Sequence, residues 1–146
     1  MAFSIKIKND NRKKILKELQ TRIDDALELC GEQAERNAKL NLEHAPRRVD
    51  TGLLRNSITF AVHGRQANSM AYSADKAKQE GGIIESGSYG GTAPDETNTV
   101  YIGTNVEYAW YVEEGTRKMV PSHFLRDALS DHDSEYKNLI EQVMNG

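Results

Sequence analysis

The sequence predicts a single α+β domain, with helices at both ends of the chain and a small, mostly antiparallel sheet between them. Apolar residues recur every three or four positions near both ends of the 146-residue chain, whereas they alternate with polar residues in short central segments. These periods are typical of amphipathic helices and of half-buried strands, respectively. We find no internal repeat and no domain boundary, so one domain is expected to span 1–146.

The first predicted element is one long helix over residues 11–42. Its apolar positions lie at helical spacing on one face, namely Ile15, Leu19, Ile23, Ala26, Cys30, Ala34 and Ala38. A helix of this length reaches roughly 45 Å at 1.5 Å per residue, which is more than a compact domain of this size needs. We therefore expect part of it to pack on a neighbouring subunit. Gly31 is its expected weak point, because glycine costs about 1 kcal/mol relative to alanine in a helix.

The middle of the chain predicts short elements separated by loops. A short helix is expected for "TGLLRNS" (51–57), followed by a half-buried strand at 58–63, in which apolar Ile58, Phe60 and Val62 alternate with the residues between them. Residues 64–98 read as a variable loop region around a short strand at Ile83 and Ile84. The segment "TVYIG" (99–103) is the next predicted strand.

Two further helices are predicted after this strand. In "NVEYAWYVEEG" (105–115), Tyr108, Tyr111 and Val112 fall on one helical face, and Gly115 stands where a left-handed C-terminal cap is wanted. Apolar and aromatic residues then step by four and three positions over 125–143, which predicts a C-terminal amphipathic helix. The poor helix formers at 130–134 favour a bend in it.

Composition excludes several classes of function. The chain carries 19 Lys and Arg against 22 Asp and Glu, for a formal net charge of −3 and a pI of about 5.8, which argues against a broad nucleic-acid-binding face. One cysteine rules out an intramolecular disulfide and suits a reducing compartment. No apolar run is long enough to span a bilayer, and residues 1–30 lack the apolar core of a signal peptide. We expect a soluble cytosolic protein.

The tripeptide Asp50-Thr51-Gly52 has two interpretations. Aspartic proteases of the retroviral type use Asp-Thr-Gly in a homodimer, where two carboxylates share a proton, and "IIESGSYGG" and "YIGTN" imitate their flap and later strand. However, a long helix precedes this tripeptide, and "LLRNS" follows it in place of a small residue and a strand. The favoured interpretation is that Asp50 caps a short helix beginning at Thr51, by accepting backbone N–H groups.

The histidines and the cysteine give no metal or catalytic set. His44, His63 and His123 are isolated in the sequence, and the side chains of "DHD" (131–133) point in different directions on a helix. No phosphate-binding loop and no nucleophile elbow appear. Cys30 lies on an apolar face and is assigned to core packing. We expect no catalytic residue, no cofactor and no metal.

The aromatic residues Tyr108, Trp110 and Tyr111 are the remaining candidates for binding. They could stack on nucleic-acid bases, but no basic stripe accompanies them. They are therefore assigned to the core or to a subunit interface. We expect Trp110, together with Ile23 of the long helix, at such an interface.

Three stretches taken together resemble a known family: "APRRVDTGLLRNSI" (45–58), "VYIGTNVEYAWYVEEGTRKMVP" (100–121) and "SHFLRDAL" (122–129). In order and spacing they are similar to the small head-tail joining proteins of tailed double-stranded DNA phages and prophages, also described as neck, tail-completion or tail-component proteins. The likeness covers most of the chain, but not 64–98. The matching positions are Asp50, Thr51, Gly52, Leu54, Ser57, Tyr108, Ala109, Glu113, Gly115 and Thr116.

The resemblance implies a structural virion protein in which these positions are architectural. It implies a ring, with a hexamer favoured over a dodecamer, between the connector or stopper of the head and the tail-terminator or tail-tube proteins. DNA would pass through without sequence-specific binding, and no membrane is involved. The protein would be in the host cytoplasm during assembly and then in the virion. Two alternatives stay open: a tail-terminator ring that caps the tail tube, and the homodimeric aspartic protease.

Overall fold

In the computed structural model, residues 2, 11–44, 53–65, 94–104, 106 and 108–146 are described. Their elements are α1 (Arg12–Glu43), α2 (Leu53–Ser57), β1 (Thr59–Val62), β2 (Val100–Gly103), α4 (Ala109–Glu114), α5 (Phe124–Ser130) and α6 (Asp133–Asn145). The predicted α+β class is thus confirmed. The predicted strand at Ile83 and Ile84 and the tripeptide at 50–52 lie outside the described residues.

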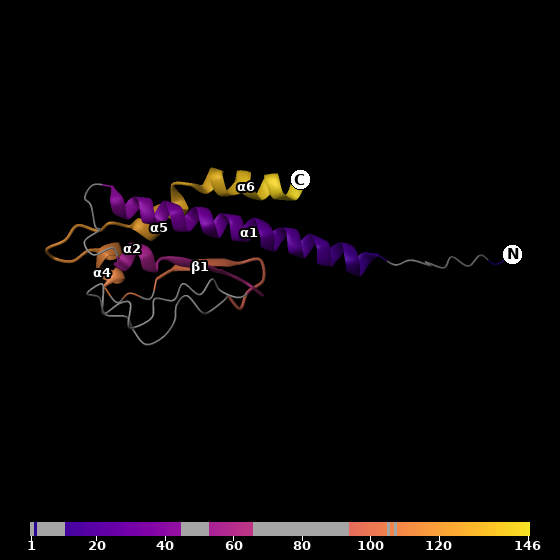
Figure 1. Ribbon diagram of the computed structural model, residues 1–146, viewed down its shortest axis with the longest axis horizontal. Helices are drawn as coiled ribbons and strands as arrows, with labels where there is room; N and C mark the ends of the chain where they lie inside the picture. The colour runs from indigo at the N-terminus through magenta and orange to yellow at the C-terminus, as the bar shows by residue number, and fades with distance from the viewer. Residues whose placement is uncertain (1, 3–10, 45–52, 66–93, 105, 107) are drawn as a thin grey trace.

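Helix α1 is the element on which the rest of the domain packs. The two strands lie along one side of it and α6 along another (Figure 1), and α1 contacts both strands as well as α2, α5 and α6. The predicted long helix is therefore confirmed. Its buried stripe consists largely of small side chains, which let neighbouring elements approach closely: Ala26, Cys30, Gly31, Ala34, Asn37, Ala38 and Leu42.

Gly31 has a packing role in this helix. A Cβ atom at this position would lie 2.5 Å from Cδ2 and 2.7 Å from Cγ of the Phe60 ring. Phe60 belongs to β1 and is only 6% exposed. The absent side chain therefore lets the aromatic ring of the strand rest on the helix, which offsets the helix propensity that glycine loses.

The strands β1 and β2 form an antiparallel pair, in which Thr59 lies opposite Gly103 and Val62 opposite Val100. Both strands were predicted, but the half-buried pattern of the first was wrong, because all four residues of β1 are buried. Phe60 faces α1, and the small side chains of Thr59 and Ala61 are covered as well. The alternation of polar and apolar residues in the sequence gives no sign that the second face of β1 is also buried.

The hydrophobic core gathers beside the C-terminal half of α1, where α2, α4 and α5 meet it. Its most deeply buried large side chains are Leu42, Ile58 and Phe124. The whole cluster consists of Ala38, Leu42, Leu54, Ile58, Val106, Ala109, Val112, Phe124 and Ala128. The three stretches that carry the family resemblance therefore contribute to a single core.

Two sequence predictions near the C-terminus need correction. Helix α4 buries Ala109 and Val112, whereas the side chains of Tyr108 and Tyr111 are 37% and 55% exposed. Tyr108, Tyr111 and Val112 therefore do not share a buried face, because Val112 turns into the core while both rings lie at the surface. Of the two locations predicted for these rings, the core is excluded and a subunit interface stays a prediction.

The second correction concerns the predicted single C-terminal helix, which is two helices in the structure. Helix α5 ends at Ser130 and α6 begins at Asp133, with His132 at non-helical φ of −121° between them. The weak helix formers at 130–134 thus produce a break where a bend was expected. Asp133 and Glu135 then place negative charge in the first turn of α6, where the helix dipole favours it.

Candidate assembly site

Ser57 joins α2 to the segment that follows β2. Its hydroxyl group donates a hydrogen bond to the carbonyl of Leu54 at 2.7 Å and shares a second hydrogen bond with the hydroxyl of Thr104. The Thr104 oxygen also accepts from the backbone N–H of Val106 at 3.1 Å. Because Leu54 and Val106 are both core residues, this hydroxyl pair fixes two segments of the resemblance against one another.

Glu113 caps the next helix along the chain. One carboxylate oxygen accepts from the backbone N–H of Leu125 at 2.9 Å, and the other accepts from that of Arg126 at 3.0 Å. These are two of the N–H groups that the first turn of α5 leaves without partners inside the helix. The residue at the N-cap of α5, His123, makes no side-chain cap hydrogen bond. Glu113 therefore supplies from α4 the negative cap that the sequence of α5 lacks.

Gly115 and Thr116 form the tight turn between α4 and α5. Gly115 ends α4 with a φ of 78°, as its position in the sequence indicated, but its ψ of 177° is not that of the left-handed cap we expected. A Cβ atom there would lie 2.7 Å from the Met119 carbonyl oxygen. Thr116 and Met119 form an antiparallel bridge, and the Thr116 hydroxyl accepts from the N–H of Lys118 at 3.2 Å. Only glycine fits this turn without strain.

The other predicted positions divide between core and surface. Leu54 and Ala109 are buried, whereas Trp110 is 68% exposed and Tyr108 also reaches the surface. Exposure excludes Trp110 from the core of this chain, so of its two predicted locations the interface remains as a prediction. Ile23 of α1 is half-buried. Asp50, Thr51 and Gly52 lie outside the described residues.

The N-terminal end of α1 carries exposed apolar side chains. We call residues 12–22 the arm; it extends past the ends of β1 and α6 (Figure 1). Ile15 and Leu16 are 60% and 64% exposed, and Leu19 is 41% exposed. At the base of the arm, Gln20 donates to the side chain of Asn98 at 3.0 Å and Arg65 donates to the carbonyl of Thr21 at 3.5 Å. The predicted apolar face continues past these contacts with its own domain.

A polar network that the sequence analysis missed holds α6 to α1 and α5. The Tyr136 hydroxyl donates to the carbonyl of Ala128 and accepts from the side-chain amide of Asn37 at 3.1 Å. Gln33 donates to the Asn37 amide oxygen at 3.1 Å, and the Cys30 thiol donates to the backbone carbonyl of Tyr136 at 3.6 Å. Burial raises the pKa of both the Tyr136 phenol and the Cys30 thiol. The available signal was Asn37, a polar residue on the small-residue stripe of α1.

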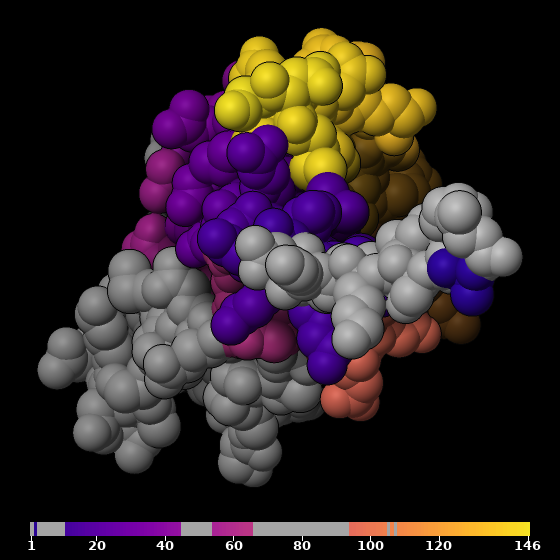
Figure 2. All heavy atoms as spheres, turned by 90° about the vertical axis from the view of Figure 1, so that its right-hand side faces the viewer, coloured from indigo at the N-terminus to yellow at the C-terminus, as the bar shows by residue number. Residues whose placement is uncertain are grey.

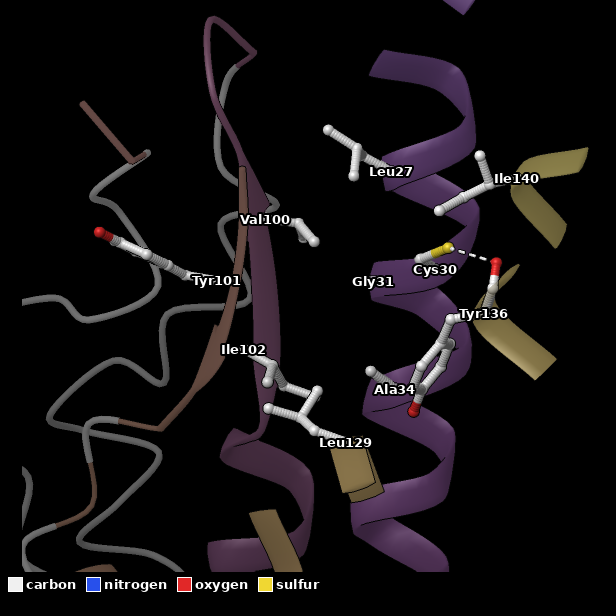
Figure 3. A pocket seen from close by; sticks show the side chains of 10 residues that line it. All are labelled: Leu27, Cys30, Gly31, Ala34, Val100, Tyr101, Ile102, Leu129, Tyr136 and Ile140. Carbon is white, nitrogen blue, oxygen red and sulfur yellow. Dashed lines mark hydrogen bonds between the residues drawn. The ribbon is translucent and has the colours of Figure 1, made fainter. Parts of the chain in front are cut away.

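An apolar groove lies between β2 and α6, with α1 as its floor (Figure 3). It encloses about 350 Å³, and we call it the groove. Tyr101 points to the opposite side of the strand. The side chains around the groove come from four elements: Leu27, Cys30 and Ala34 of α1, Val100 and Ile102 of β2, Leu129 of α5, and Tyr136 and Ile140 of α6.

The described residues bring together no set of three or more His, Cys, Asp or Glu side chains that could hold a metal ion. Within the same residues, no helix has both the length and the apolar character needed to cross a membrane. No family model, no curated protein and no solved structure matches the chain. The resemblance to head-tail joining proteins therefore stays a prediction.

Proposed function

We propose that this chain is a structural protein of the phage head-tail joint, a neck or tail-completion protein that assembles as a ring between the head connector and the tail. The proposal rests on the structural roles of the residues that carry the resemblance. Around one core, Ser57 donates a hydrogen bond to the backbone of α2, Glu113 caps the first turn of α5, and Gly115 allows the tight turn after α4. Their roles are those of a scaffold, as the resemblance implies.

The distribution of exposed apolar side chains supports a protein that contacts neighbours at both of its ends. The arm lies at one end of the molecule and α4, which carries Trp110, lies at the other (Figure 1). Neighbouring exposed apolar side chains, such as Ile15, Leu16 and Leu19 of the arm, are typical of interaction surfaces. The net charge of −3 suits a ring that lets DNA pass without holding its phosphates.

Deleting the gene from the phage or prophage genome that encodes it tests the proposal. We expect DNA-filled heads and finished tails of normal length that fail to join, seen by negative-stain electron microscopy. A plasmid copy of the gene should restore complete particles. Tails of uncontrolled length would instead identify the tail-terminator alternative, and normal virions from the deletion strain would refute both roles.

Complementation with Asp50 variants separates the scaffold from the protease. If Asp50 caps a helix, Asp50→Asn keeps an oxygen acceptor and should restore particles as well as the unaltered gene does. A protease predicts that Asp50→Asn fails as completely as Asp50→Ala, because neither side chain exchanges a proton. Restoration by the asparagine variant would therefore rule out catalysis by this carboxylate.

A further inference from the structure

We propose that the arm of one copy of the chain docks into the groove of a second copy. This inference deepens the proposed function by naming the contact between subunits. Only the closure of that contact into a ring rests on the proposed function. The two surfaces are different patches of one molecule. In a ring each copy gives its arm to one neighbour and receives an arm from the other, so the contact is heterologous. Repeating a heterologous contact gives a closed ring or an open filament.

The arm exposes apolar side chains and positive charges that a binding partner would cover. Ile15, Leu16 and Leu19 lie on one of its faces and are all more than 40% exposed. The arm also carries five Lys and Arg residues and one Glu. It is therefore both apolar along one face and strongly positive, and it continues the stripe that Ile23 and Leu27 begin in the body.

The groove offers the complementary surface, and its own arm cannot fill it. Leu27, Cys30 and Ala34 form the floor of the groove, and the arm consists of the preceding turns of the same straight helix (Figures 1 and 3). The arm therefore points away along the axis of that floor. Seen from the arm's end, α1 emerges beside α6 (Figure 2). An arm that enters the groove must therefore belong to another copy of the chain.

Charge favours a second copy as the source of that helix. Residues 23–146 contain 12 basic and 20 acidic residues, so the chain is divided into a positive arm and a negative body. Two of the segments beside the groove share this sign, whereas α5 carries one charge of each sign. Asp95 and Glu96 precede β2, and α6 carries three acidic residues against one lysine, Lys137, whose pairing with Asp133 leaves two acidic residues in excess. Opposite charges around an apolar centre steer and orient such a contact.

A matched pair of leucine variants tests the contact. Leu19 and Leu40 both belong to α1 and are both 41% exposed, but only Leu19 lies in the arm. In sedimentation velocity the unaltered protein should show a mass that rises with concentration and falls with added salt, because screening weakens exposed charge pairs. Leu19→Glu should weaken this association by about tenfold or more, since docking would bury a charge, whereas Leu40→Glu should not. An unaltered protein that stays monomeric at low salt, or two variants that behave alike, would overturn the proposal.

Cross-linking tests the location of the contact. One protein would carry Leu16→Cys and another Ile140→Cys, both with Cys30→Ala, and the two would be mixed with a short bismaleimide. We expect mixed dimers joining arm to groove. Thr21→Cys, which lies on the far face of the same helix, is the control and should give none. Cross-links only between two Leu16→Cys proteins would mean that arms pair with each other, and that result would refute docking in the groove.

The two experiments also separate this inference from the proposed function. Arm-to-groove cross-links in purified protein would support the contact even if the deletion strain made normal virions. Separate heads and tails in the deletion strain, with no cross-link, would support the joint and refute the contact. Binding of the arm to vesicles of anionic lipid by a protein that remains monomeric would assign its basic apolar face to a membrane surface, and would also refute the contact.

Discussion

Glu113 lies in α4, yet its carboxylate completes the first turn of α5. Replacing it with alanine leaves two backbone N–H groups without that acceptor, so we expect Glu113→Ala to lower the free energy of unfolding by about 1–2 kcal/mol. Glu113→Gln keeps one acceptor oxygen, so its free energy of unfolding should lie between those of the alanine variant and the unaltered protein. Urea titration followed by circular dichroism measures the difference. Equal stability of the alanine variant and the unaltered protein would show that the cap is dispensable.

Tyr136 gives stability a dependence on alkaline pH. Burial raises the pKa of its phenol above the ordinary value of 10.0. The unfolded chain therefore ionises first as the pH rises, so the contribution of this group is fully present below about pH 10 and is lost above it. Tyr136→Phe should cost about 1–2 kcal/mol at neutral pH through the lost hydrogen bonds to Asn37 and Ala128. The gap in melting temperature between the two proteins should narrow above pH 10; a constant gap would contradict this account.

At the scale of elements, the contact between Gly31 and Phe60 decides how closely β1 approaches α1. Gly31→Ala gains about 1 kcal/mol of helix propensity, but it places a methyl group against the ring, and overpacking typically costs about 1–3 kcal/mol. We expect a net loss of stability. Combining it with Phe60→Leu should cost less than the sum of the two single changes in a double-mutant cycle, because the smaller side chain relieves the clash. Additive losses would show that the two residues do not interact.

The elements with a strong local signal were predictable. Helix α1 follows from a helical period sustained from Ile15 to Ala38, and the two strands follow from β-branched and aromatic residues between turn signals. Gly115 was also predictable as a helix end, because the residues before it have helical spacing. In each case the information lies within a few residues of the element that it specifies.

Features that depend on contacts between distant segments were not predictable. The exposed face of α4 depends on how closely its backbone approaches the core, and the second covered face of β1 depends on packing that periodicity does not record. The cap from Glu113 to α5 depends on the path of the turn between α4 and α5, which the sequence does not specify. The groove joins α1 to β2 and α6, whose residues are far apart in the sequence. Patterns within a short stretch of sequence carry no information about these contacts between distant segments.

At the scale of the whole molecule, stability should be uneven along α1. The arm has exposed apolar side chains, whereas the segment from Ala26 to Leu42 is covered by the strands, α5 and α6. Backbone amides at 16–20 should therefore exchange with deuterium through local fraying, far faster than those at 34–38, when the protein is dilute. Mass spectrometry of peptic peptides measures both segments in one sample. Equal protection of the two in monomeric protein would mean that the arm is held by its own chain.

Some partners of α1 are distant from it in sequence, and this has a consequence for synthesis. Cys30 and Asn37 bond to Tyr136, which lies 106 and 99 residues further along, and Asn41 bonds to Phe124, 83 residues further along. Helix α1 is synthesised before all of these partners; α2 and β1 follow it closely, whereas α5 and α6 are made much later. The face of α1 that α5 and α6 cover must therefore stay exposed until these two helices have been made. We expect the nascent chain to depend on chaperones that shield apolar helices until α6 emerges.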